Sequence, residues 1–384
     1  MRYRLCLTAV LIGLMSSVSW GIEISHSVES FISKGSQFQM GWVRQDNQTY
    51  YNAAFSTNFS LMDLQVSSAV NAYFPSSGTG ATPVTWTFKK VKYEFENTAG
   101  VQWGWLTDVS LGQGLLMDHY DTGSGGNTAE FTPQKSGVKG YLNLNPVRID
   151  GLYTARELYG AHVGYTLFQD SFILGSPVVV GGTYINDRKG VKGGLAQSGY
   201  AADIALPIGG DFLTAFIESA WLENHGNGQS TGIRGDFFGM FSYRGEYRLL
   251  GPGFVPGYFG RVYEQGAPTF PTSTDTSGGA FVSVGSSWFD GYIQTDFQYE
   301  QYRSDTLLTG AAGWKPIFGV AGVVHYTQPF KGNISPVLDA ELLISGSSLD
   351  TIVDVRQVYA STGTETSYSL GGRVSLTKLM GLPF

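Results

Sequence analysis

The sequence predicts an all-β fold: a single antiparallel, up-and-down transmembrane β-barrel of about 18 strands, within roughly 16 to 20, with a polar lumen. Three observations predict it. An export leader precedes the rest of the chain, polar and apolar residues then alternate with a period of two, and long polar connections alternate with short turns. This combination is typical of a meander of strands whose two rims face different environments.

The leader, residues 1–21, has the order of a secretory signal peptide. Arg2 and Arg4 supply a basic start, a short apolar stretch follows, and small residues allow cleavage after Ser19 or Gly21. The apolar stretch is too short to span a bilayer as a helix. We therefore expect the chain to be exported and the leader to be removed.

Composition excludes several classes of protein. Charged residues make up 14% and aromatic residues also 14%, with 52 glycines and a formal net charge of −7. The absence of a basic block argues against nucleic acid as a partner. Cys6, the only cysteine, lies in the leader, so the mature protein is expected to have no disulfide. Beyond the leader no run of ~18 apolar residues predicts a transmembrane helix.

Period-two alternation marks the candidate strands. It is clearest in residues 84–96, 101–111, 213–221, 240–249 and 292–302. In the first of these, the parity of the apolar residues shifts at two adjacent lysines, as a β-bulge would produce. The second is expected to be one unbroken strand. Residues 310–326 are glycine-rich and broken by a Lys-Pro pair, which predicts two strands with a tight turn.

The connections between these strands differ in length. Long polar loops are predicted over 75–83, 112–136, 224–232 and 266–279, and short turns over 97–100 and 289–291. The predicted organisation is therefore a removed signal peptide over 1–21 and one barrel over 22–384. Its longest outer loop is expected over 112–136.

Lipid explains the two faces of these strands better than a soluble fold does. Propellers and β-helices repeat a motif every ~20 to 50 residues, and no such motif is found. A sheet that spans a bilayer must close on itself to pair its backbone, so one face meets lipid and the other lines a lumen. A lysine or arginine that faced lipid at mid-depth would cost ~2–4 kcal/mol, which places the charged face inside.

The charged residues of the polar face are the predicted pore lining. Arg244, Glu246 and Arg248 occupy every second position of one strand, and Asp296 and Glu300 share a face of another. Opposed charges in a water-filled pore set a field that filters solutes. The alternative is internal salt bridging in a filled interior. The full predicted set is Arg244, Glu246, Arg248, Asp296, Glu300, Lys92, Glu94, Asp108 and Glu218.

The end of the chain adds a resemblance to a known class. Over 368–384, apolar residues hold one parity up to the terminal Phe384. This resembles the last strand of Gram-negative outer-membrane β-barrel proteins, which end on an aromatic residue read by the barrel-assembly machinery. With the leader and the meander, the resemblance implies a location in the bacterial outer membrane. It also implies membrane lipids, the assembly machinery and small hydrophilic solutes as partners, with a homo-oligomer as an open option.

In the porins of that class a long loop folds inward and narrows the channel. The resemblance therefore makes residues 112–136 a candidate constriction, with a mobile outer loop as the other option. The same segment holds Asp118, Asp121 and Glu130 around flexible glycines. Their spacing does not fit an EF-hand, so no calcium site is assigned to them. His162, on a polar face, is expected to hydrogen-bond a neighbour.

The function expected from these observations is passive diffusion of small hydrophilic solutes through a porin-like channel. No enzymatic activity, cofactor or metal site is predicted, because no metalloprotease, phosphate-loop, dinucleotide or serine-hydrolase motif is present. Two alternatives stay open. One is a plugged structural or surface-binding barrel without conductance, and the other is a lipid-modifying enzyme at the rim that uses His225 and Ser230 in an outer loop. A transporter of apolar solutes is disfavoured by the charged face.

Overall fold

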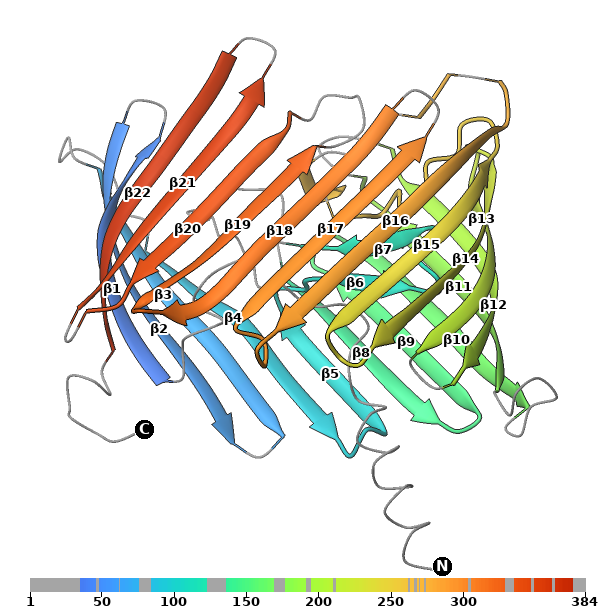
Figure 1. Ribbon diagram of the computed structural model, residues 1–384, viewed down its shortest axis with the longest axis horizontal. Coiled ribbons are helices and arrows are strands. Elements are labelled where there is room, and N and C mark those ends of the chain that lie inside the picture. Colours follow the sequence, from blue (N-terminus) through green and yellow to red (C-terminus); the bar gives the residue numbers. More distant parts are fainter. Residues whose placement is uncertain are drawn as a thin grey trace, which may run out of the picture.

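A computed structural model gives the structure of the chain (Figure 1). The predicted leader over 1–21, residues 123–135 of the predicted long loop and Phe384 lie outside the described residues. The structure describes residues 35–45, 48–61, 63–75, 84–122, 136–168, 177–190, 195–209, 212–261, 263–265, 268, 270–272, 274–302, 305–328, 335–346, 349–360 and 363–375.

One antiparallel sheet of 20 strands forms the wall. Each strand pairs with its neighbours in the chain, except that β5 pairs with β8 because β6 and β7 leave the wall. The wall strands are β1 (Gly35–Gln45), β2 (Gln48–Leu61), β3 (Leu64–Pro75), β4 (Val84–Phe95), β5 (Ala99–Gly104), β8 (Gly137–Leu144), β9 (Val147–Thr154), β10 (Leu158–Phe168), β11 (Val178–Asp187), β12 (Gln197–Ile208), β13 (Leu213–Leu222), β14 (Asn227–Phe237), β15 (Phe241–Leu250), β16 (Ser277–Trp288), β17 (Ile293–Tyr302), β18 (Asp305–Ile317), β19 (Val320–Gln328), β20 (Val337–Ile344), β21 (Asp350–Ala360) and β22 (Gly363–Ser375).

The sheet closes on itself, because β1 pairs with β22 as well as with β2. The closing register runs from Gln37 opposite Ser375 to Arg44 opposite Tyr368. None of the described wall strands is therefore left with a free edge. The structure confirms the predicted all-β, antiparallel, up-and-down barrel, and its 20 strands lie at the upper end of the predicted range.

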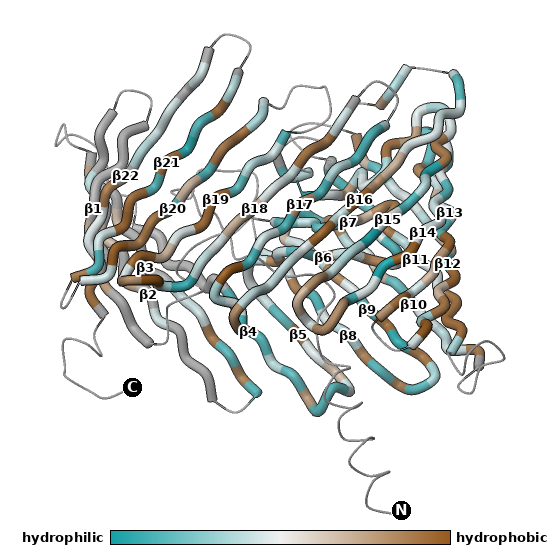
Figure 2. Tube along the Cα trace, viewed as in Figure 1, coloured by the Kyte–Doolittle hydropathy of each residue, from teal (hydrophilic) through white to brown (hydrophobic). Residues whose placement is uncertain are grey.

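Side chains alternate between the two faces of the wall. On β13, Ile217 is exposed on the outside, whereas its neighbours Phe216 and Glu218 are buried on the inside. On β15, Tyr247 is exposed and Glu246 is buried. Figure 2 shows the hydropathy changing from residue to residue along the wall strands. The outward face presents large apolar side chains, as contact with lipid requires.

Two local predictions about the wall are confirmed. The pairing between β3 and β4 skips Lys89, which is the extra residue of a bulge. After the bulge, Tyr93 and Phe95 are exposed on the outer face. Residues 310–326 fall on β18 and β19, which are joined by a turn at Phe318 and Gly319.

Two predicted segments are wrong. The strand expected over 101–111 ends at Gly104, which has a φ of 117°, and the chain then turns into the barrel. Residues 224–232 are not a long loop, because β14 begins at Asn227 after a turn over 223–226. The polar residues of this stretch are accommodated in a strand because β13 and β15 pair with their backbone on both sides.

The two longest connections leave from the same rim. They are residues 105–136 and 251–276, and both follow strands that run away from the rim where β1 begins and β22 ends. Long loops on one rim and short turns on the other are typical of outer-membrane barrels. Within the described residues, no helix has the length and apolar content needed to cross a bilayer.

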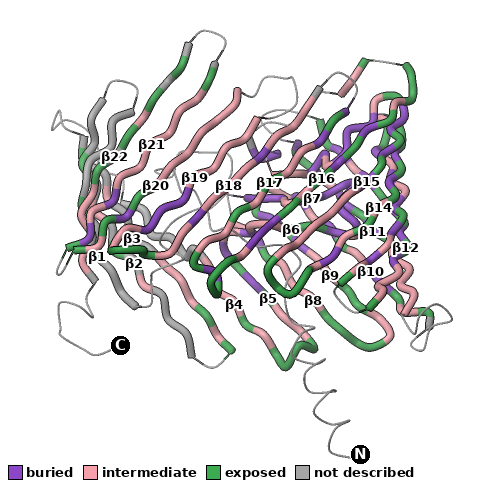
Figure 3. Tube along the Cα trace, in the orientation of Figure 1, coloured by how far each residue is buried: buried purple, intermediate pink, exposed green. Residues whose placement is uncertain are grey.

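Two segments from this rim lie inside the barrel. The inner hairpin is residues 105–122 and contains a separate two-stranded sheet of β6 (Val109–Leu111) and β7 (Met117–Tyr120). The inner strap is the described part of residues 251–265 and ends in a short 3-10 helix, η2 (Tyr263–Gln265). Figure 3 shows most of the buried residues gathered in the half of the barrel that contains β6 and β7.

The largest apolar core lies between these inner segments and the wall. Its buried members are Leu106, Val109, Leu111, Leu115, Leu116, Met117, Tyr120, Leu152, Leu158, Ile185, Ala201, Ala220, Leu222, Leu250, Phe254, Val255, Tyr258, Phe259, Tyr263 and Tyr302. A smaller cluster of Ala321, Val323, Leu343 and Ile352 lies on the inside of β19, β20 and β21. The charged interior expected from the alternation therefore shares the barrel with an apolar core.

Candidate functional site in the barrel interior

The inner hairpin turns sharply between its two strands. Gly112 and Gly114 have φ values of 65° and 91°, which L side chains rarely adopt. An added Cβ at Gly112 would also come within 2.8 Å of a carboxylate oxygen of Glu218. The hairpin tip, residues 112–116, can therefore approach the wall closely only because glycine stands at these positions.

Wall carboxylates hold the hairpin tip. Glu218 accepts hydrogen bonds from the backbone N–H groups of Leu115 at 2.7 Å and Gln113 at 3.3 Å. Asp203 accepts one from the Gln113 side-chain amide at 2.8 Å and lies 3.0 Å from His162 Nε2. The expectation that His162 bonds a neighbour is confirmed. These contacts pair the backbone donors of a buried turn, which would otherwise be costly to bury.

A ladder of alternating charges continues from the tip along β15. Arg244 donates to the carbonyl of Gln113 and to Glu246, and Arg248 donates to the other oxygen of Glu246 at 2.8 Å and to Glu300 on β17. The ring of Phe281 lies beside both arginines, with its centroid 5.0 Å from Arg244 Cζ and 4.4 Å from Arg248 Cζ. Each charge is thus paired inside the protein rather than solvated.

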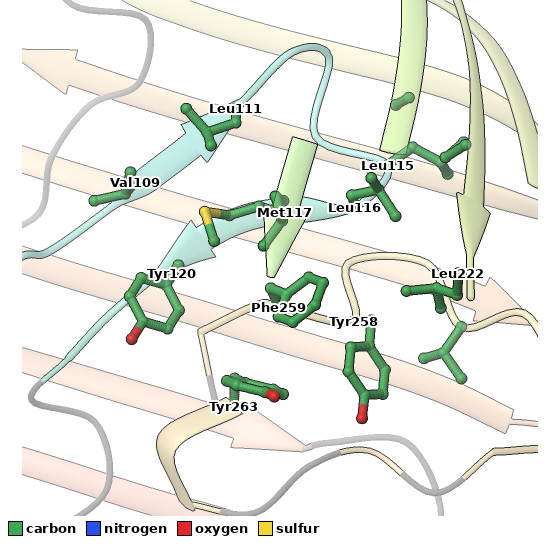
Figure 4. Packing of buried hydrophobic residues seen from close by; sticks show 14 of the residues in the cluster. Val109, Leu111, Leu115, Leu116, Met117, Tyr120, Leu222, Tyr258, Phe259 and Tyr263 are labelled. Atoms are coloured by element: carbon green, nitrogen blue, oxygen red, sulfur yellow. The ribbon is translucent and has the colours of Figure 1, made fainter. Parts of the chain in front are cut away.

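The inner strap packs on the hairpin through its backbone. Gly257 N–H donates to the Leu115 carbonyl at 2.8 Å, and Phe259 N–H donates to the Leu116 carbonyl at 3.0 Å. Figure 4 shows the strap side chains Tyr258, Phe259 and Tyr263 beside Leu116, Met117 and Tyr120 of the hairpin. The two inner segments therefore form one layer that packs against the wall.

Phenol and carboxyl groups fasten the far end of this layer. Tyr120 Oη donates to Glu264 at 2.5 Å, and Arg156 pairs with the other oxygen of Glu264. Tyr263 Oη donates to Asp187 at 2.7 Å. Burial raises the pKa of Glu264, and the charge of Arg156 and the bond from Tyr120 offset only part of that rise.

The sequence did not reveal the inner strap. No prediction was made for residues 254–265, in which Phe254, Val255, Tyr258 and Phe259 are all buried. A usable signal was present, because four large apolar residues within six positions are unusual for a solvent-exposed loop.

Most of the predicted pore-lining residues do face the barrel interior, but they fall into two groups. Glu218, Glu246, Arg248 and Glu300 are buried against the inner segments or one another, and Arg244 belongs to the same ladder. Lys92 and Glu94 form a separate, partly exposed pair at 2.9 Å on β4. Asp296 is partly exposed on the inside of β17.

Asp108 is not on the wall, in contrast to the prediction from its parity. It precedes β6 on the inner hairpin, where its φ is 55°, because the wall strand ends at Gly104. A further inward-facing pair was not selected from the sequence, although its strands alternate. Asp339 on β20 and Arg356 on β21 lie 3.7 Å apart and are both partly exposed.

The rim enzyme hypothesis is not supported by the positions of its residues. Ser230 is buried on the inside of β14, opposite Glu218 and Arg248 in the register. His225 lies in the preceding turn, where its ring stacks on Phe270 with centroids 3.4 Å apart. The described residues contain no group of three or more histidine, cysteine or acidic side chains placed to hold a metal ion.

The fit between the strap and the wall makes a testable prediction. A Cβ added at Gly228 on β14 would lie 2.6 Å from the ring of Phe254, which is fully buried. We expect Gly228→Ala to lower the free energy of unfolding by about 1–3 kcal/mol, because the overpacked ring must move. The measurement is equilibrium unfolding by urea in detergent, followed by tryptophan fluorescence.

Gly245→Ala is the matched control for this prediction. Gly245 lies on the neighbouring strand β15, and an added Cβ there would meet no atom within 4 Å. The control should change the free energy of unfolding by less than about 0.5 kcal/mol. Equal effects of the two variants would contradict the packing of the strap on β14.

Similar proteins are found by comparison of three-dimensional structures and not by comparison of sequences. No known family matches the sequence, and no curated protein matches it either. Among solved structures, OccK5 (OpdH) of Pseudomonas aeruginosa is 10% identical and matches 88% of this chain and 96% of its own, with a TM-score of 0.37. A porin variant of Rh. blastica is 8% identical over 88% of this chain and 98% of its own, with a TM-score of 0.31.

The siderophore receptor PirA of Acinetobacter baumannii also matches. It is 7% identical over 89% of this chain and 74% of its own, with a TM-score of 0.38. The barrel itself is established by the strand pairing and not by these superpositions. The chain is an all-β antiparallel barrel that resembles Gram-negative outer-membrane β-barrels at low sequence identity.

Proposed function

We propose that this protein is a channel of the bacterial outer membrane through which small hydrophilic solutes diffuse passively. One observation carries the proposal: charged side chains that point into a closed barrel remain open to solvent. The exposed fractions are 32% and 44% for the side chains of Lys92 and Glu94, and 46% and 32% for those of Asp339 and Arg356. Water therefore reaches the interior beside β4 and beside β20 and β21.

The barrel is wide enough for a water-filled path beside β4, β20 and β21. Barrels of about 16 to 18 strands enclose an aqueous channel, whereas those of about 22 strands hold a plug. The present wall has 20 strands, and the inner hairpin and inner strap pack mainly on the wall from β8 to β17. We place the path between the polar face of the inner hairpin and the charged wall opposite its core.

A plugged barrel is the second candidate, and the buried charge ladder favours it. Arg248, Glu246 and Glu300 fasten an inner layer that fills part of the interior, as a plug would. The two candidates differ in one measurable property. A channel passes current in a planar lipid bilayer, whereas a plugged barrel does not. In both cases the outward apolar face is placed in outer-membrane lipid, and export by the 1–21 leader and assembly through Phe384 stay predictions.

Single cysteines test the path directly, because Cys6 of the predicted leader is the only native cysteine. We expect the purified barrel to give conductance steps. In Lys92→Cys, a hydrophilic thiol reagent added from the aqueous phase should lower the conductance of each step, because the label narrows the path.

The matched control is Tyr93→Cys, one residue along β4, where the side chain is exposed on the outer face. Its conductance should not respond to the reagent. Absence of steps would contradict the channel and favour the plugged barrel. Steps that are equally sensitive at both positions would contradict the proposed direction of these side chains.

A further inference from the structure

The inner hairpin has a polar edge, formed by Asp108, Ser110 and His119, that makes none of the hydrogen bonds described above between the hairpin and the wall. Val109, Leu111 and Tyr120 are buried in the apolar core, whereas Ser110 is exposed and His119 is partly exposed. The polar edge therefore faces away from the core, into the part of the barrel where the proposed path runs. Asp108 is also partly exposed.

Two carboxylates flank one imidazole on this edge. His119 Nδ1 contacts Asp108 Oδ1, and His119 Nε2 lies 3.7 Å from Asp118 Oδ1. Ser110 Oγ donates to Asp118 at 3.0 Å and accepts the backbone N–H of His119 at 3.0 Å. Asp108 and His119 both have left-handed backbone, with φ values of 55° and 52°, a region that aspartate and histidine adopt more often than most other residues.

We infer that the cluster of Asp108, Asp118 and His119 determines the charge selectivity of the channel, and that one proton on His119 sets its charge. This inference rests on the proposed function. With His119 protonated, the three groups carry a net charge of −1. With His119 neutral, they carry −2. Small cations and cationic amines are then the favoured solutes, and the preference is stronger when the imidazole is neutral.

Several other charges face this cluster. Arg261 of the inner strap interacts electrostatically with both Asp108 and His119, and Lys139 of β8 interacts in the same way with Asp108. Asp296 of β17 interacts electrostatically with His119. Arg244 lies 3.4 Å from Asp118, and Arg248 also acts on it. Guanidinium, ammonium and carboxyl groups ordinarily titrate far from neutral pH, so His119 is the group among these whose ordinary pKa lies nearest to neutral pH.

The direction of the response follows from the surroundings. Burial would lower the pKa of His119, but the negative charges of Asp118 and Asp108 outweigh burial and raise the pKa above its usual value of 6.5. His119 therefore keeps its proton to a higher pH than an unperturbed imidazole does. As pH rises through this raised pKa the proton is lost, the cluster becomes more negative, and the preference for cations increases.

The test is the reversal potential of the intact barrel in a bilayer under a KCl gradient, from pH 5 to pH 9. One unit charge at ~8 Å in ~0.01 M salt changes the ratio of cation to anion near it by about fourfold. We expect the K⁺ to Cl⁻ permeability ratio of the native barrel to rise by about that factor. In His119→Gln the ratio should stay flat over the same range.

Two other histidines provide controls. His225→Gln, at the rim, and His325→Gln, on β19 opposite Asp339, should keep the native pH profile. Loss of the pH response in His325→Gln rather than in His119→Gln would overturn the inference. So would a native barrel whose permeability ratio does not change with pH.

A second variant keeps the inference testable if His119→Gln does not fold, as judged by heat-modifiable gel migration. Asp108→Asn removes a carboxylate that holds the proton on His119, so the midpoint of the pH response should move to lower pH. An unchanged midpoint would overturn the inference. A native barrel without conductance steps would overturn the proposed function together with it, whereas steps without these pH effects would overturn the inference alone.

Discussion

Replacing Arg248 with alanine is expected to lower the free energy of unfolding by about 3–5 kcal/mol, because it leaves buried carboxylates without their partner. Arg248 is 2% exposed and pairs with Glu246 at 2.8 Å and with Glu300. The guanidinium also lies over the ring of Phe281. The loss of stability has three causes. Glu300 is left without a partner, Glu246 loses one of its two arginine partners, and a cavity opens beside the ring of Phe281. Equilibrium unfolding by urea in detergent measures it.

Arg148→Ala is the matched control for this variant. Arg148 also makes two hydrogen bonds to a carboxylate, Asp150, both at 2.9 Å, but its side chain is 57% exposed. Water replaces an exposed partner at little cost, so the control should lose less than about 1 kcal/mol. Similar losses in the two variants would show that the ladder is solvated and would contradict its burial.

A double variant separates pairing from burial. Arg248→Met with Glu300→Gln removes both charges of one bridge and retains much of the side-chain volume. It should lose less free energy of unfolding than Arg248→Ala alone, because no unpaired charge remains at Glu300. A double variant that is less stable than the single one would show that the volume of the ladder matters more than its charge.

Local pattern was enough to predict most of the wall. A period of two follows from strand geometry alone, so it fixed which residues face outward before any pairing was known. The bulge at Lys89 was predictable for the same reason, since one extra residue reverses the parity. The inward direction of Glu246 and Arg248 is a consequence of the same rule.

The same pattern could not separate lipid from a protein core. Alternation continues from Val101 to Leu111, but Val101 faces outward on the wall while Leu111 is buried in the interior. Lipid and a protein core are both apolar, so the hydrophobicity of a side chain does not distinguish between these two environments. Gly104, where the chain leaves the wall, was the available sign, and one glycine in a chain with 52 of them is a weak one.

The surroundings of the charges were also beyond the sequence. An arginine that faces inward can be hydrogen-bonded either by water or by a carboxylate, and the sequence of its own strand does not distinguish these two cases. The partners come from far along the chain, since Arg244 meets Gln113 and Asp118 of the inner hairpin. Arg248 and Glu300 form a buried salt bridge, which is the filled interior that the sequence left open as an alternative. Lys92 and Glu94 are partly exposed to solvent, as expected of residues that line a pore.

Removal of the carboxylate that holds the hairpin tip is expected to have the largest effect on conductance. Glu218→Ala leaves the backbone N–H groups of Gln113 and Leu115 buried without their acceptor. Each unpaired donor costs about 1–3 kcal/mol, so docking of residues 112–116 should weaken by about 2–6 kcal/mol. The tip should then leave the wall for part of the time, and single-channel records should show larger and noisier current steps than the native barrel.

Limited proteolysis gives a second readout of the same change, because a released tip becomes accessible to protease while the docked tip is buried. Ser230→Ala is the matched control. Ser230 is buried opposite Glu218 in the register, and its hydroxyl has no hydrogen-bond partner among the described residues. Its conductance and cleavage pattern should match the native barrel. If Glu218→Ala behaves in the same way, the apolar core alone holds the hairpin, and the wall carboxylate serves only to pair a turn that would stay docked without it.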